Sequence, residues 1–404
     1  MRSPNIRYLV GLDHLRAFAA LLIVFYHALH LLSLGPRAPG GDLTQVWWIS
    51  RNPLVVLIEE GHTSVALFMV LSGFVFSVGA LGRDIAYGAY LKNRFLRIYP
   101  LFVFMTLVAL VAYPAGYSLL ALLQTLLFQG DFPGNLNLPP YTSMFWAVGV
   151  EFQFYLLFPL LHRFVEREGA RWVLGCILLC ISMRLVAAIG GGSNARDVAY
   201  WHLLGRLDQF LIGMLAARVF EHVRGRALPW GLLSATAFAA TLALLMAFNQ
   251  AGGWPTIPLW KVAWPTCEAL AWALVIVTYT AFAARVPQLI SRPLAALGNV
   301  SYSIYLLHYT CIVLLPRFVP VATGTDANWA SQTYVLTVVL PVLLPLAALS
   351  YYVVERPFLA LRVRYLKEPS ARSEEAARRP DAAMTSSAPT APPTEPVSSV
   401  RQSA

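Results

Sequence analysis

The chain has 404 residues, of which 58% are hydrophobic and only 12% are charged, and its mean hydropathy is +0.60. Soluble globular proteins have roughly 45–50% apolar and about 25% charged residues, so this composition excludes that class and indicates a polytopic membrane protein. The formal net charge of +10 does not indicate a nucleic-acid partner, because most Lys and Arg lie between apolar runs or in the C-terminal tail, where they specify topology.

Ten apolar runs recur along the chain, each about 19–24 residues long and able to cross the ~30 Å hydrocarbon core as a helix. The sequence therefore predicts an all-α, polytopic bundle of about ten transmembrane helices. The segment Ser118–Gln129 is apolar but too short to cross, so we expect it at an interface or as a re-entrant segment. The predicted crossings are Leu12–Leu34, Thr63–Leu81, Ile98–Gly116, Thr142–His162, Trp172–Gly190, His202–Phe220, Trp230–Asn249, Trp260–Ala283, Val300–Pro320 and Gln332–Val354.

Positively charged residues predict the orientation of these helices. They gather in alternate loops, and the intervening loops hold only Arg37, Arg51 and Arg196. Because basic loops stay in the cytoplasm, we expect both termini to be cytoplasmic. Leu12–Leu34 is also too long for the apolar core of a cleavable signal peptide.

The composition changes near Leu366, after which Ala, Ser, Pro, Thr, Glu and Arg follow one another without periodicity. Such a segment buries too little apolar surface to fold. We therefore expect residues 1–365 to form a transmembrane domain and residues 366–404 to form a disordered cytoplasmic tail.

The first predicted span carries Arg16 and His27, which lie eleven positions apart. Both side chains leave the same helix face, separated by ~16 Å along the axis. A cation at the bilayer centre costs on the order of 3 kcal/mol unless it faces protein or water, so this stripe is expected to line an internal site. Asp13, one turn before Arg16, is placed for an orienting ion pair. The alternative is that Arg16 reaches the headgroups and His27 is a hydrogen-bonded core residue.

Glu151 lies about halfway through a predicted crossing, with Gln153 close by. Carboxylates inside membranes are costly and usually functional, and a carboxylate that faces a histidine holds the imidazole ready to act as a general base. The alternative is a buried structural ion pair with Arg16, Arg184 or Arg206.

Arg94 and Arg97 lie at the cytoplasmic end of a predicted crossing, three positions apart, so they project together. Two guanidinium groups suit phosphate oxygens, although two arginines beside a span are also an ordinary topology anchor. Further polar groups inside predicted spans favour a functional site because they lie on different helices. These supporting residues are Ser72, Tyr305 and His308.

We expect no metal site in this chain. Cys176 and Cys180 lie one helical turn apart, but no histidine or carboxylate is near enough in sequence to complete a zinc site. The sequence also contains no P-loop, Gly-x-Ser-x-Gly elbow, His-Glu-x-x-His motif or dinucleotide fingerprint, which disfavours NTP-driven, serine-hydrolase and metalloenzyme chemistry.

Six segments, in order along the chain, resemble the acyltransferase-3 family of integral membrane O-acyltransferases, which modify surface polysaccharides, lipopolysaccharide, peptidoglycan and some small molecules. Two positions depart from the family pattern: Phe152 replaces the second of a usual glutamate pair, and Ala66 stands where members often have Asp. A mechanism that needs two adjacent carboxylates is therefore not expected here. The segments are LDHLRAFAALLIVFYHA (Leu12–Ala28), LFMVLSGF (Leu67–Phe74), RFLRIYP (Arg94–Pro100), Trp146–Tyr155, SYSIYLLH (Ser301–His308) and VVERPF (Val353–Phe358).

The resemblance implies a multi-pass enzyme of the bacterial cytoplasmic membrane that uses acyl-CoA as co-substrate, acetyl-CoA by default, with no bound cofactor. The acceptor would be a hydroxyl of a cell-surface glycan, glycolipid or small molecule. Arg16, Arg94 and Arg97 would bind the donor. His27 would take the proton from the acceptor hydroxyl, and Glu151 would orient the imidazole or stabilise its charge. Ser72 and His27 are the conceivable covalent acyl carriers.

Two other classes of function remain open from the residues alone. Buried Arg, His and Glu in a helical bundle also suit a proton-coupled transporter of an anionic or sugar-like solute. A scaffold that only presents glycolipid to other proteins needs no chemistry from His27. Covalently acylated product distinguishes the enzyme from both.

Overall fold

The computed structural model describes residues 5, 7–34, 47–129, 132, 134–190, 195–321 and 327–367. In this part the chain is helical apart from turns and loops, and its β-type pairing is a single bridge between Ile85 and Leu366. The predicted all-α fold is therefore confirmed. The predicted tail lies outside the described residues from residue 368 onward.

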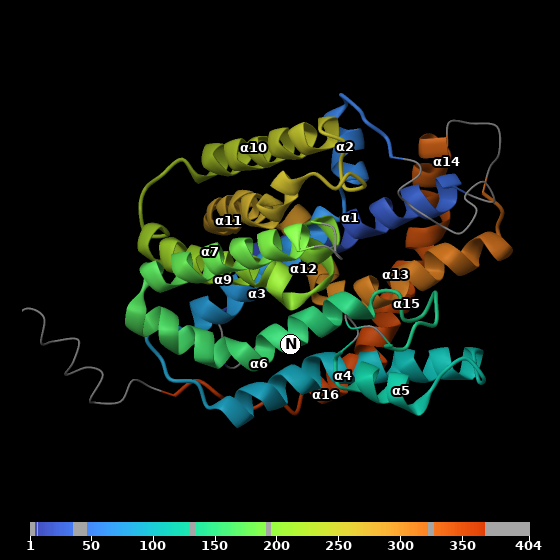
Figure 1. The fold of residues 1–404 in the computed structure, drawn as a ribbon, viewed down its shortest axis with the longest axis horizontal. Helices are drawn as coiled ribbons and strands as arrows, with labels where there is room; N and C mark the ends of the chain where they lie inside the picture. The colour runs from blue at the N-terminus through green and yellow to red at the C-terminus, as the bar shows by residue number, and fades with distance from the viewer. Residues whose placement is uncertain are drawn as a thin grey trace, which may run out of the picture.

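The bundle consists of long helices joined by short ones (Figure 1). α10 runs along one side of the bundle and α4 along the opposite side, with α1, α3 and α9 between them. In chain order the α-helices are α1 (Val10–Leu34), α2 (Pro53–Glu59), α3 (Thr63–Ala80), α4 (Tyr87–Ala112), α5 (Leu119–Leu126), α6 (Phe145–Glu168), α7 (Ala170–Ile189), α8 (Ala195–Trp201), α9 (Leu203–Val223), α10 (Trp230–Gln250), α11 (Trp264–Phe282), α12 (Gln288–Asn299), α13 (Ser301–Leu314), α14 (Ala327–Tyr334), α15 (Leu340–Ser350) and α16 (Arg356–Leu359).

Eight helical segments among the described residues are long and apolar enough to cross a membrane. The bent pair α12 and α13, which meet at 70°, brings the number to nine. α9 is the remaining predicted crossing, and it carries Arg206, Asp208, Arg218 and Glu221. Arg206 and Asp208 are buried inside the protein, so neighbouring helices rather than lipid surround the charged start of α9.

One helix boundary differs from the expected one, and one crossing is interrupted. α4 begins at Tyr87 rather than Ile98. The basic turn of α4, just before Ile98, has low hydropathy and was therefore expected to be a loop, but it is part of the helix. The last crossing is interrupted by π-helical turns at Val335–Val339 and Tyr351–Glu355. The short segment after α4 contains α5, an eight-residue helix. Its expected place at an interface or as a re-entrant segment stays a prediction.

Close contact between α3 and α9 holds the centre of the bundle together. A Cβ atom added at Gly73 would lie 2.0 Å from the Phe210 carbonyl oxygen, and one at Gly213 would lie 2.2 Å from the Val70 carbonyl oxygen. Each helix therefore presents a glycine to the backbone of the other, as small residues do at membrane helix interfaces. This contact places Ser72 beside the centre of the bundle.

The two ends of the described chain meet at one end of the bundle. The Asn5 side chain donates to the Val363 carbonyl (3.0 Å) and accepts from the Tyr365 amide (2.7 Å). Asn93 on α4 exchanges two hydrogen bonds with Val363, of 2.7 and 2.9 Å. The segment after α16 is thus fixed against α4 and the N-terminal segment, which brings Arg362 next to the basic turn of α4.

Candidate active site

A cavity of about 460 Å³ opens at this end of the bundle and extends into its interior. Residues from α1, α3, α4, α6 and α13 line it, together with the segments before α1 and after α16. Phe68 and Val65 on α3 and Tyr305 on α13 line its deep part. The cavity therefore joins parts of the chain that are far apart in sequence.

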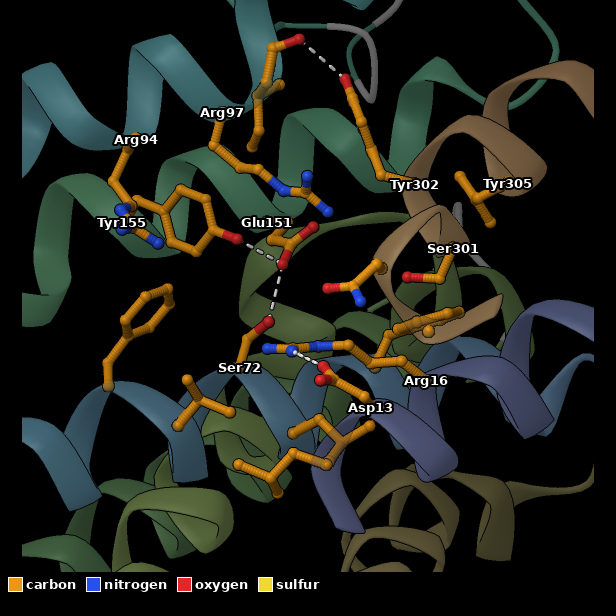
Figure 2. A pocket seen from close by; sticks show the side chains of 18 of the residues that line it. Asp13, Arg16, Ser72, Arg94, Arg97, Glu151, Tyr155, Ser301, Tyr302 and Tyr305 are labelled. Atoms are coloured by element: carbon orange, nitrogen blue, oxygen red, sulfur yellow. Dashed lines mark hydrogen bonds and ion pairs between the residues drawn. The ribbon is translucent and has the colours of Figure 1, made fainter. Parts of the chain in front are cut away.

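Glu151 lies at the centre of the cavity wall, where two hydroxyl groups hold its carboxylate (Figure 2). The Ser72 hydroxyl on α3 donates to Glu151 Oε1 at 2.6 Å. The Tyr155 hydroxyl, one turn further along α6, donates to the same oxygen. Two hydroxyl donors, one from α3 and one from α6, therefore fix the orientation of this carboxyl group. Neither hydrogen-bonded residue is an arginine, and Glu151 forms no ion pair within the described part of the chain. The alternative of a structural ion pair with Arg16, Arg184 or Arg206 is therefore not what the structure shows.

Arg16 and Arg97 direct their guanidinium groups into the cavity on two sides of Glu151 (Figure 2). Arg16 forms the expected ion pair with Asp13, at 3.0 Å. Arg97 donates to Glu355 Oε2 at 2.9 Å, and this carboxylate is fully buried. Each guanidinium group is therefore held by its own carboxylate, and its remaining N–H donors face the cavity.

Arg94 lies in the cavity wall against aromatic rings rather than in the headgroup region. Its guanidinium carbon lies 4.6 Å from the Phe76 ring centroid and 5.7 Å from that of Tyr155. Its residue surface is only 9% exposed, whereas an arginine that anchors a helix to lipid headgroups is solvated. The topology-anchor alternative does not describe this side chain.

Two further arginines, Arg7 and Arg362, line the mouth of the cavity. Burial, and next the charges of Arg97 and Arg94, lower the pKa of Arg362 below its ordinary value, although an arginine remains a cation throughout the physiological range. The contributions of Arg97 and Arg94 to this shift show that their positive charges lie close to Arg362. The lining holds five arginines, Arg7, Arg16, Arg94, Arg97 and Arg362, against the carboxylates Asp13 and Glu151.

His27 lies further along α1 and is not among the residues that line this cavity. Its Nδ1 atom lies 2.9 Å from Nε2 of His308 on α13. The expected pairing of His27 with Glu151 is therefore not what the structure shows, because Glu151 contacts Ser72 and Tyr155 on the side of Arg16. Helical periodicity placed Arg16 and His27 on one face of α1, but it does not reveal which neighbouring helix each residue meets.

The remaining predicted residues divide between the cavity and its surroundings. Ser72 and Tyr305 line the cavity. Gln153 does not: it donates to the Phe128 carbonyl at 3.2 Å and fastens the segment after α5 to α6. No group of three or more His, Cys, Asp or Glu residues that could hold a metal ion occurs in the described ranges.

Sequence reasoning did not single out four residues of this site: Arg7, Tyr155, Arg362 and Glu355. Tyr155 lies in the Trp146–Tyr155 segment and Glu355 lies in VVERPF. The motifs therefore contain both residues but gave neither of them a functional role. Arg7 and Arg362 lie in terminal segments that hydropathy treats as ordinary basic flanks. Only their packing around the mouth of the cavity reveals them.

Comparison with known proteins gives matches along most of the chain. A family model described as an acyltransferase domain matches residues 9–352. The chain is 26% identical to acyltransferase MdmB of Streptomyces mycarofaciens, over 89% of this chain and 93% of that protein. It is 23% identical to O-acetyltransferase OatA of Staphylococcus aureus, over 88% of this chain but only 58% of OatA. No solved structure matches this one.

Proposed function

Because the chain belongs to the acyltransferase family that its six sequence segments resemble, we propose that it is a membrane-bound O-acyltransferase that uses acyl-CoA as donor. The acyl group is acetyl by default. The acceptor is a hydroxyl of a cell-surface glycan, glycolipid or related small molecule. The name of OatA, an O-acetyltransferase, supports transfer to oxygen, although the chain spans little more than half of that protein.

The observation that carries this proposal is the arginine-rich cavity. Coenzyme A carries several phosphate charges, and guanidinium groups bind phosphate oxygens through two parallel hydrogen bonds. Arg94 and Arg97 on α4 are the proposed phosphate ligands at the cavity mouth. Arg16 contacts the donor deeper in the cavity, and its Asp13 partner keeps the guanidinium turned inward. The flexible pantetheine chain then extends toward Tyr305 and the interior.

His27 is the proposed general base, which removes the proton from the acceptor hydroxyl as that oxygen attacks the thioester carbonyl. The ~16 Å rise along α1 between Arg16 and His27 separates the donor's phosphate end from this step. Glu151 acts on the donor side, where its fixed negative charge stabilises the arginines and orients the Ser72 and Tyr155 hydroxyls. This role replaces the orientation of His27 that the sequence suggested.

In the proposed topology the cavity mouth faces the cytoplasm, because the basic turn of α4 and both termini of the described chain lie at that end. This supports ten crossings with both termini inside the cell, of which α9 is the crossing enclosed by protein. Residues 1–365 are the proposed transmembrane enzyme in the bacterial cytoplasmic membrane, and residues 366–404 are the proposed cytoplasmic tail.

The test of the proposed chemistry is transfer of label from [¹⁴C]acetyl-CoA to the glycolipid and glycan fractions of membranes that contain the full chain. We expect labelled product with the wild type and loss of at least about 100-fold with His27→Ala. Glu151→Gln is also expected to lose activity. The matched control is His222→Ala, since His222 is an exposed histidine at the end of α9. Undiminished transfer by His27→Ala at equal protein level contradicts the base assignment.

The donor assignment has a separate test in the same membranes. Arg94→Ala and Arg97→Ala should raise the KM for acetyl-CoA by about ten-fold or more, since each loses a charge-assisted hydrogen bond worth about 1.5–3 kcal/mol. Their acceptor dependence should not change. A lower turnover with an unchanged donor KM contradicts the phosphate assignment.

A further inference from the structure

We propose that His308 is a positioning residue that fixes the tautomer of His27, so that Nε2 of His27 keeps the lone pair that accepts the substrate proton. This inference rests on the proposed base role of His27. It adds a second histidine, 281 positions further along the chain, whose effect on the reaction passes entirely through the first.

The hydrogen bonds of His308 determine which of its ring nitrogens is protonated. This residue lies on α13 with no exposed surface. Its Nδ1 atom lies 2.6 Å from the Tyr305 carbonyl oxygen and 3.2 Å from the Ile304 carbonyl oxygen. A carbonyl oxygen only accepts hydrogen bonds, so Nδ1 of His308 must carry a proton. The helix backbone therefore determines which nitrogen of His308 is protonated.

The charge of His308 follows from its burial and its partners. An imidazolium carries protons on both nitrogens, whereas a neutral imidazole with a proton on Nδ1 leaves a lone pair on Nε2. Burying an unpaired charge is costly, and none of the ion pairs and hydrogen bonds found among the described residues gives His308 or His27 a carboxylate partner. His308 is therefore neutral, and its Nε2 is an acceptor.

The acceptor nitrogen of His308 in turn determines the tautomer of His27. Nδ1 of His27 lies 2.9 Å from Nε2 of His308, and an acceptor at that distance requires a donor opposite it. Nδ1 of His27 must then carry the proton, which leaves the lone pair on its Nε2. In serine proteases a carboxylate makes the same choice for the catalytic histidine, and a wrong tautomer there costs a factor of about 10⁴ in kcat.

The surroundings of the pair explain why His27 rather than His308 meets the acceptor. His308 is completely enclosed, while His27 keeps a partly exposed surface. The two rings are tilted by 33° with centroids 5.1 Å apart, and the edge-on ring of Tyr309 lies 5.4 Å from His27. α13 therefore holds one side of the His27 ring, through both the His308 hydrogen bond and the Tyr309 ring contact.

The test compares kinetics of the full-length His308→Leu and His308→Gln variants in membranes. Leucine offers no acceptor, whereas the glutamine amide can accept from Nδ1 of His27 and also donate to the Tyr305 carbonyl. We expect His308→Leu to lower kcat by about 10²–10⁴-fold with an unchanged KM for acetyl-CoA. We expect His308→Gln to recover at least ten-fold of that loss. Equal loss in both variants, or a loss carried by the donor KM, overturns the proposal.

A second measurement does not depend on the variants folding. ¹⁵N spectra of histidine-labelled wild type in bilayers, with the His27 signals assigned by their absence from His27→Ala, should show a protonated Nδ1 and an unprotonated Nε2. The opposite pattern overturns the inference even if both His308 variants are inactive. If His27→Ala transfers acyl groups normally, the base role itself fails. If His27→Ala is inactive while His308→Leu has normal kcat, only the positioning role fails.

Discussion

The two hydroxyl groups that donate hydrogen bonds to Glu151 provide a sharp test of the donor side of the site, because the chain offers a matched control for each. Ser72→Ala and Tyr155→Phe each remove one hydrogen bond to the same carboxylate oxygen. Ser77→Ala and Tyr90→Phe remove hydroxyl groups that are also buried on α3 and α4 but have no hydrogen-bond partner among the residues that the structure describes. The volume lost is the same within each pair, so the difference between the members of a pair reports the hydrogen bond.

The expected magnitude follows from the charge of the acceptor. A hydrogen bond to a charged group contributes about 1.5–3 kcal/mol. Removing a hydroxyl group that has no hydrogen-bond partner changes the free energy little. Since about 1.4 kcal/mol corresponds to a ten-fold rate difference, Ser72→Ala and Tyr155→Phe should each lower kcat/KM for acetyl-CoA by roughly 10–100-fold. Ser77→Ala and Tyr90→Phe should remain within about three-fold of the wild type.

The assay is initial-rate transfer of labelled acetyl groups in membranes, normalised to the amount of folded protein. The double variant Ser72→Ala/Tyr155→Phe should lose less than the product of the two single losses, because both hydroxyls act on one oxygen. Equal rates for Ser72→Ala and Ser77→Ala would refute the reasoning that Glu151 needs its hydroxyl partners for transfer.

Two further predictions concern stability. Burial raises the pKa of Glu59, at the end of α2, to about 8 from an ordinary value of 4.5. Between these pH values the folded protein therefore binds more protons than the unfolded chain. The contribution of protonated Glu59 to stability is lost as the pH rises from about 4.5 to 8. Glu59→Gln should flatten the dependence of thermal unfolding on pH in that window, by about 1.4 kcal/mol for each pKa unit removed, and an unaltered slope would contradict the burial argument. Gly73→Ala places a methyl group against the Phe210 backbone and should destabilise the protein by about 1–3 kcal/mol or more. Gly175→Ala, on the open side of α7, should not destabilise it. Thermal unfolding of the detergent-solubilised protein measures both variants, and equal unfolding midpoints would disprove close contact between α3 and α9.

Much of this protein was predictable from the sequence because the bilayer imposes a local rule. Every backbone group inside lipid must be hydrogen-bonded within its own segment, so each long apolar run forms a helix. The cost of polar residues inside a span marked Arg16, Ser72 and Glu151 as parts of a site, and the three-residue spacing of Arg94 and Arg97 suggested a phosphate-binding pair. The structure places all five around one cavity. Motif order also identified the family correctly.

The tertiary structure alone decided which side chains meet. His27 pairs with His308 rather than Glu151, and Arg97 pairs with Glu355, 258 positions away. These contacts depend on how each helix rotates and tilts against its neighbours, and close approaches such as that of α3 to α9 set those rotations. Hydrophobic periodicity specifies the buried face of a helix but not its partner, so the sequence determined the helices and the tertiary structure determined the chemistry between them.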